Sequence, residues 1–114
     1  MAGGISTHVL DTARGRPAAG VRVSLERREE SGTWTAWGEG ATDGNGRLAG
    51  LAGTRALVAG VFRLRFEIGA YFAAQGIESF HPRVEVAFEI RRLEESHHVP
   101  LLVSPFGYTT YRGT

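Results

Sequence analysis

Apolar residues at every second position, interrupted by glycine-rich turns, are the feature that most constrains how this chain can fold. VRVSLER, VFRLRFEIG and RVEVAFEI each alternate apolar and polar side chains. Successive side chains point to opposite faces only in a β-strand, so each segment is expected to be a strand with one buried face. The apolar members of these rows are Val21, Val23, Leu25, Phe62, Leu64, Phe66, Ile68, Val84, Val86, Phe88 and Ile90.

Turn-forming segments such as ARGRPAAG, DGNG and SPFG separate the predicted strands. The only helix expected is a short one at Tyr71–Gln75. Many short strands with glycine turns indicate an all-β fold, an antiparallel β-sandwich or barrel. A length of 114 residues suits one domain over residues 1–114.

Composition excludes several kinds of chemistry. The chain has no cysteine, so it has neither disulfides nor a thiolate nucleophile. All 13 basic residues are arginine, which excludes lysine Schiff-base chemistry, and the net charge of +1 does not suggest a nucleic-acid partner. The sequence contains neither a signal-peptide pattern nor an apolar run of about 20 residues. A cytoplasmic protein without membrane contact is expected.

Two of the four histidines lie on the polar sides of predicted strands. In ISTHVLD, His8 shares a face with Ser6, opposite Ile5 and Val9. His98 lies opposite the aliphatic row that follows it in HHVPLLV. Such a face is either solvated or functional. His97 and His98 are adjacent and point to opposite faces, so no metal site is expected.

The segment TDGNGRL is expected to be a hairpin turn rather than a calcium loop, because the later ligands of a calcium loop are missing. Arg47 directly follows this turn, where its guanidinium could lie over the sheet or in solvent. His81, in the turn before Pro82, is expected to be an exposed loop residue.

The last seven residues, YTTYRGT, carry aromatic rings, an arginine and hydroxyl groups to the end of the chain. In a final strand, Tyr108, Thr110 and Arg112 would share one face, and Thr109 and Tyr111 the other. Terminal residues are usually loosely held, so a stretch this rich in functional groups requires an explanation.

Four segments together resemble the 5-hydroxyisourate hydrolases, which are related to transthyretin. They are THVLDTARGRPAAGVRVSLER, TDGNGRL, GAYFAAQGIESFHPRVEVAFEI and HHVPLLVSPFGYTTYRGT. The resemblance extends from about Ile5 to Thr114. It implies a prealbumin/transthyretin-like antiparallel sandwich of about seven to eight strands with one short helix.

The resemblance also implies which residues form the site. The family's two catalytic histidines correspond to His8 and His98, and its catalytic arginine corresponds to Arg47. Its C-terminal tetrapeptide, which would bind substrate, corresponds to Tyr111–Thr114, that is Tyr111, Arg112, Gly113 and Thr114. The final threonine replaces the family's usual serine and keeps the hydroxyl group.

The activity implied is hydrolysis of 5-hydroxyisourate to 2-oxo-4-hydroxy-4-carboxy-5-ureidoimidazoline, a step of urate degradation, with no metal or organic cofactor. Members of the family are homotetramers, dimers of dimers, with active sites in a channel between subunits. Two alternatives lie in other classes: a transthyretin-like carrier of an aromatic small molecule, and a structural or adhesive sandwich whose polar residues are merely solvated.

Overall fold

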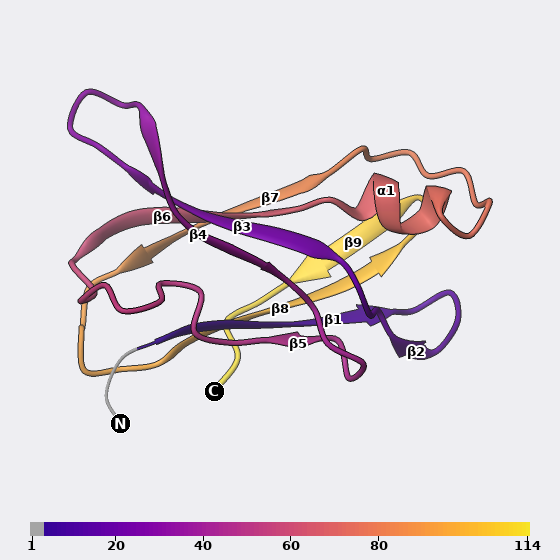
Figure 1. Ribbon diagram of the computed structural model, residues 1–114, viewed down its shortest axis with the longest axis horizontal. Helices are drawn as coiled ribbons and strands as arrows, with labels where there is room; N and C mark the ends of the chain where they lie inside the picture. Colours follow the sequence, from indigo (N-terminus) through magenta and orange to yellow (C-terminus); the bar gives the residue numbers. More distant parts are fainter. Residues whose placement is uncertain (1–3) are drawn as a thin grey trace.

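The computed structural model describes residues 4–114, which form two β-sheets and one short helix (Figure 1). One sheet has the strand order β2-β1-β8-β9, with β5 also paired to β1, and the other has the order β4-β3-β6-β7. The first sheet contains β1 (Ile5–Asp11), β2 (Arg16–Pro17), β5 (Arg47–Leu48), β8 (His97–Ser104) and β9 (Gly107–Thr110). The second contains β3 (Arg22–Arg28), β4 (Trp34–Ala41), β6 (Gly60–Phe66) and β7 (Val84–Ile90).

The all-β sandwich prediction is confirmed, with one difference in strand direction. Seven strands have four or more residues, and β2 and β5 have two residues each. The central pair, β1 and β8, is parallel, running from Ile5 opposite His97 to Asp11 opposite Val103. Strands joined by a tight turn must be antiparallel, whereas these two are separated by most of the chain, so no turn dictates their direction.

The alternating apolar residues form the core between the sheets. Val23, Leu25, Phe62, Leu64 and Phe66 are all at most 2% exposed. Val86 and Phe88, in the middle of β7, are only partly buried and pack against this cluster. The sheet with β3, β4, β6 and β7 runs across the upper part of Figure 1, above β1, β5 and β8.

The helix α1 spans Ile68–Ala73, so it begins three residues before the position predicted at Tyr71. Ile68 is fully buried, as the alternation predicted, but it belongs to the helix and not to the preceding strand. Four residues later Phe72 lies on the same helical face and is also buried. The hydroxyl of Tyr71 donates to the Asp11 carboxylate at 2.9 Å, which fastens the helix to the end of β1. Within residues 4–114, this six-residue helix is far too short to cross a membrane.

The segment TDGNGRL forms a turn, as predicted, but not a hairpin, because it leads from β4 in one sheet to β5 in the other. One carboxylate oxygen of Asp43 accepts the backbone N–H groups of Asn45 at 2.8 Å and Arg47 at 2.9 Å. These hydrogen bonds stabilise the charged form and lower the pKa of Asp43. The carboxylate therefore fixes the backbone at the point where Arg47 enters β5.

Gly46 allows this turn to lie against β1. Its φ of +75° favours glycine, and a Cβ there would overlap the carbonyl oxygen of Val9. The carbonyl oxygen of Gly46 in turn accepts the backbone N–H of Val9 at 2.7 Å. The turn is thereby held on the same strand that carries His8.

Replacing Gly46 by alanine is expected to lower the free energy of unfolding by about 1–3 kcal/mol, because it combines a left-handed backbone with a steric overlap. Gly44→Ala in the same turn is the matched control, since a Cβ at Gly44 meets no atom within 4 Å. It should change stability by less than about 0.5 kcal/mol. Urea denaturation of both variants measures the difference, and equal stabilities would contradict this account of the turn.

Candidate active site

Strand pairing alone brings Arg47 beside His8 on the outer face of the five-stranded sheet. His8 is opposite Arg47 on β5 and opposite Pro100 on β8. Residues that are opposite each other in neighbouring strands point to the same face. Ile5, Thr7 and Val9, which alternate with His8, are buried, so His8 points away from the core.

His98 lies in the adjacent row of the same face. It is opposite Ser6 on β1, and the Ser6 hydroxyl is hydrogen-bonded to Nδ1 of His98 at 2.9 Å. On its other side it forms an isolated bridge with Gly113, whose N–H donates to the His98 carbonyl at 2.8 Å. The two histidines, Arg47 and the C-terminal tail therefore meet on one surface.

The C-terminal tail continues the register of β9 after that strand ends. Leu101 is opposite Thr110, and the same register carried three residues further places Gly113 opposite His98, as observed. The predicted final strand is interrupted because Pro100, the residue facing the gap, has no N–H to donate. Thr110 compensates in part, since its hydroxyl donates to the carbonyl oxygen of Pro100 at 2.7 Å.

A backbone carbonyl group fixes the proton on the His8 ring. Nε2 of His8 lies 2.9 Å from the carbonyl oxygen of Asn45 in the turn before β5. A carbonyl oxygen can only accept, so Nε2 is the protonated nitrogen. In the neutral ring, Nδ1 is then left as an unprotonated acceptor.

The pKa of His98 is held below its ordinary value, first by burial and then by the positive charge of Arg47 and by His8. Burial and a neighbouring cation both disfavour the imidazolium form. The ring is therefore neutral near pH 7. Arg47 itself is exposed and remains cationic, so the surface combines one fixed positive charge with two imidazoles.

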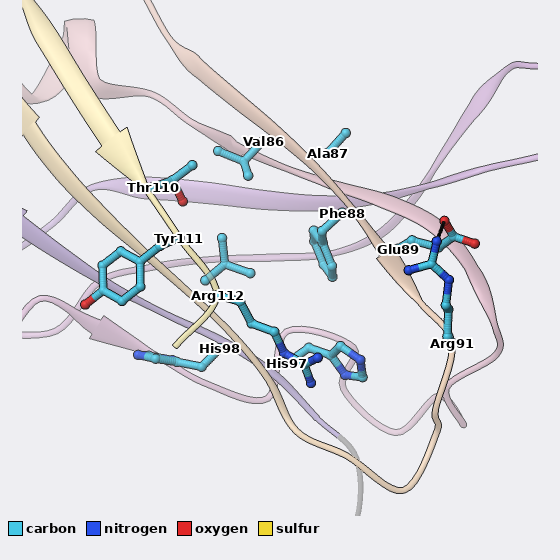
Figure 2. Close-up of a pocket in the computed structure, with 11 residues that line it drawn as sticks. Val86, Ala87, Phe88, Glu89, Arg91, His97, His98, Thr110, Tyr111 and Arg112 are labelled. Carbon is cyan, nitrogen blue, oxygen red and sulfur yellow. Dashed lines mark hydrogen bonds and ion pairs between the residues drawn. The ribbon is translucent and has the colours of Figure 1, made fainter. Parts of the chain in front are cut away.

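Arg112 lies on the opposite side of the tail from His98, as the alternation of the tail requires. Its guanidinium donates to the Glu95 carboxylate and to the carbonyl oxygen of Ser96, both at 3.1 Å. Figure 2 shows it beside the ring of His97, with the rings of His98 and Tyr111 on the other side of the tail. Arg112 thus anchors the tail to the β7–β8 loop.

A cavity of about 360 Å³ opens on this second side, between β7 and the tail. Val86 and Phe88 form one wall, and His97 and Arg112 the other (Figure 2). His97 is 5% exposed, and its Nδ1 has no hydrogen-bond partner in the described part of the chain. Burial and the nearby Arg112 lower the pKa of His97. His98 and Tyr111 also line this cavity, whereas His8 and Arg47 do not, so it borders the histidine surface without containing the whole site.

His81 is a loop residue, as predicted, but the prediction that it is exposed is wrong. Its ring is half-buried between Phe80 and Tyr108, at centroid distances of 4.9 and 5.2 Å. Both contacts are edge-to-face, a geometry that aromatic rings favour. This packing could not be predicted from residue types, because Tyr108 comes from a segment far from His81 in the chain.

The structure brings His8, Arg47, His98, Tyr111 and Gly113 to one face, and it places Arg112 on the other. Two groups at the site were not anticipated from the sequence: the hydroxyl of Ser6 and the carbonyl of Asn45. The alternation in ISTHVLD places Ser6 on the face of His8, which was the one available signal. Every residue has a backbone carbonyl group, so residue types could not predict that the Asn45 carbonyl contacts His8.

Comparison with known proteins shows which family this chain matches. The model of the HIUase/transthyretin family matches residues 5–113. The 5-hydroxyisourate hydrolase of Caulobacter vibrioides is 46% identical over 97% of this chain and 98% of its own. The solved 5-hydroxyisourate hydrolase of Klebsiella pneumoniae is 38% identical, with a TM-score of 0.86, over 98% of this chain and 99% of its own.

A transthyretin has an equally similar fold. Sea bream transthyretin, solved in complex with thyroxine, is 32% identical over 96% of this chain and 94% of its own, with a TM-score of 0.91. The shape of the sandwich therefore does not separate a hydrolase from a carrier. The site residues must make that distinction.

Gly113→Ala is expected to displace the imidazole of His98 while the sandwich stays folded. A Cβ at Gly113 would overlap Cδ2 of His98 and approach Cγ of Pro100 to 3.3 Å. Gly107→Ala is the control, because its nearest neighbour would be Oγ of Ser104 at 3.9 Å. The imidazole NMR signals of His98 should shift in the first variant only. Unchanged signals in Gly113→Ala would refute the close contact between the tail and the ring.

Proposed function

This chain belongs to the HIUase/transthyretin family, and we propose that it hydrolyses 5-hydroxyisourate to 2-oxo-4-hydroxy-4-carboxy-5-ureidoimidazoline. The reaction is a step of urate degradation, and a single domain over residues 1–114 would carry it out. The observation that carries the proposal is the gathering of His8, Arg47 and His98 on one face by strand register. Hydrolases 46% and 38% identical to the chain support it.

The reaction requires three things of the protein. The oxygen of a water molecule bonds to a ring carbonyl carbon, the adjacent C–N bond breaks, and the freed nitrogen takes up a proton. A base must accept the proton of water, a donor must stabilise the oxyanion, and the planar substrate must be held in place. All three can be supplied by imidazole and guanidinium groups, without a metal or an organic cofactor.

His8 is the proposed base. Its Nε2 is occupied by the carbonyl of Asn45, so Nδ1 is the nitrogen free to accept the proton of water. Because the tautomer is fixed by backbone, the acceptor is available before substrate binds. The protonated ring can then deliver the same proton to the nitrogen that leaves the carbonyl carbon.

Arg47 is the proposed residue for substrate orientation and charge stabilisation. Its position opposite His8 puts a permanent positive charge beside the attacked carbonyl group. Planar guanidinium donors suit an oxygen-rich purine derivative. His98 is neutral and lies in the row of residues next to that of His8, where it completes the polar face.

The tail would complete the substrate pocket. Tyr111 and Gly113 share the face of His98, and Thr114 follows at the end of the chain. Arg112 contributes through the opposite side, where its bonds to Glu95 and Ser96 hold the tail in place. On this proposal, the functional groups of Tyr111–Thr114 are explained by their position in a wall of the site.

We further propose that the protein is a homotetramer, a dimer of dimers, in which neighbouring subunits enclose this face. On one chain the site is an open surface, and enclosure would exclude water from the charged groups. Phe80 and Phe106 are 72% and 67% exposed, and Tyr111 is 56% exposed. Exposed large apolar side chains are the kind that a subunit interface would cover.

The direct test is the ultraviolet decay of freshly prepared 5-hydroxyisourate, with and without protein. The wild-type protein should accelerate the decay. His8→Gln should lower kcat by about 10²–10⁴-fold, the usual contribution of a general base. Arg47→Gln should lower it by roughly 10²–10³-fold, as for the loss of an oxyanion donor.

Arg22→Gln is the control for these variants. Arg22 forms an exposed ion pair with Glu39 on the other sheet, and its loss should leave kcat unchanged. A wild-type protein that binds the substrate without accelerating its decay would favour the carrier alternative. Full activity in both His8→Gln and Arg47→Gln would overturn the assignment of the site.

The assembly has its own measurement. Light scattering at micromolar concentration should give four times the mass of the 12.3 kDa chain. Tyr111→Ser on the proposed enclosed face should weaken the association. A wild-type protein that remains monomeric while fully active would contradict an enclosed, shared site.

A further inference from the structure

The two histidines of the site are held through opposite nitrogens. Nε2 of His8 is bound to a carbonyl oxygen, while Nδ1 of His98 is bound to the hydroxyl of Ser6. Each ring therefore keeps a different nitrogen free of these hydrogen bonds. A carbonyl fixes the tautomer of His8, whereas a hydroxyl group can either donate or accept.

Ser6 is well placed to fix the ring of His98. The two residues are directly opposite in the parallel pairing of β1 and β8, so the backbone holds their side chains together. The hydrogen bond is 2.9 Å long and partly buried. Gly113 packs against the same ring from the neighbouring strand position. The imidazole is thus confined on two sides, with its Nε2 edge away from the serine.

We propose that Ser6 is a positioning residue that donates its hydroxyl proton to Nδ1 of His98, so that the neutral ring keeps a proton on Nε2 and donates it in a hydrogen bond to the developing oxyanion. This inference rests on the proposed hydrolase function. It gives the two histidines different roles. His8 accepts the proton of water at Nδ1, and His98 stabilises the developing oxyanion without losing its own proton.

The environment of His98 supports this direction of the hydrogen bond. An imidazole nitrogen is a much stronger base than an alcohol oxygen, so the hydroxyl is the better donor of the two. Burial, Arg47 and His8 all lower the pKa of the ring, which keeps it neutral. A neutral imidazole with a lowered pKa can polarise a substrate carbonyl group as a hydrogen-bond donor.

The proton balance closes without His98 becoming an anion. Water gives its proton to Nδ1 of His8 as its oxygen bonds to the carbonyl carbon. When the C–N bond breaks, the protonated His8 returns that proton to the leaving nitrogen. His98 donates only a hydrogen bond throughout, so its Nε2 proton remains in place at the end of the cycle.

The test measures the tautomer of His98 directly. ¹⁵N NMR of the wild-type protein at neutral pH, with the His98 signals assigned by their loss in His98→Gln, should show the proton on Nε2. Ser6→Thr, which retains a hydroxyl group, should keep that tautomer. Ser6→Ala should give a mixture of the two tautomers. A wild-type ring protonated on Nδ1 would overturn the proposal.

Enzyme kinetics provide a second test of the role of Ser6. Ser6→Ala should lower kcat by about 3–10-fold with little change in KM, the loss expected for one net hydrogen bond used in the transition state. Ser6→Thr should restore most of kcat, and Ser24→Ala on the other sheet should leave it unchanged. A folded Ser6→Ala protein with unaltered kcat would also overturn the proposal.

The two proposals fail in different ways. If the wild-type protein does not accelerate the decay of 5-hydroxyisourate, the hydrolase function fails, whatever the tautomer of His98. If the wild-type protein is active but His98 carries its proton on Nδ1, only the role of Ser6 fails. Should Ser6→Ala not fold, the wild-type tautomer decides the question alone.

Discussion

The parallel pairing of β1 with β8 is the constraint on which the rest of the site depends. Because Ser6 is opposite His98 and His8 is opposite Pro100, two histidines 90 positions apart become neighbours on one face. The same pairing places their alternating partners in the core, where Val9 and Leu101 are fully buried. A slip of one residue between the two strands would leave one imidazole on the outer face and turn the other inward. Burial of the aliphatic rows therefore fixes the geometry of the polar face.

The elements around this pair bring in the remaining groups. The turn before β5 lies on β1 because Gly46 leaves room for the Val9 carbonyl, and it delivers both Arg47 and the Asn45 carbonyl to His8. The tail follows β8 past the gap at Pro100 and closes on His98. Its two sides then have different roles: Gly113 contacts the imidazole, whereas Arg112 anchors the tail beside the adjoining cavity.

Much of this fold follows from the sequence, because alternation identifies the buried side of each strand without tertiary information. It placed His8 and His98 on polar faces and Ile68 in the core. It could not show that Ile68 begins a helix, because a buried apolar residue at this position fits both the repeat of a strand and the repeat of a helix. Nor could it give the parallel direction of β1 and β8, the contact between Ser6 and His98, or the packing of His81, all of which depend on distant segments.

We propose that the substrate reacts on the outer face that carries His8, Arg47 and His98. A crystal structure with a stable, planar purine analogue of the substrate tests it most directly. The analogue should contact all three residues, with its ring against the end of the tail. Binding instead in the cavity between Phe88 and His97, with the histidine face left empty, would contradict it.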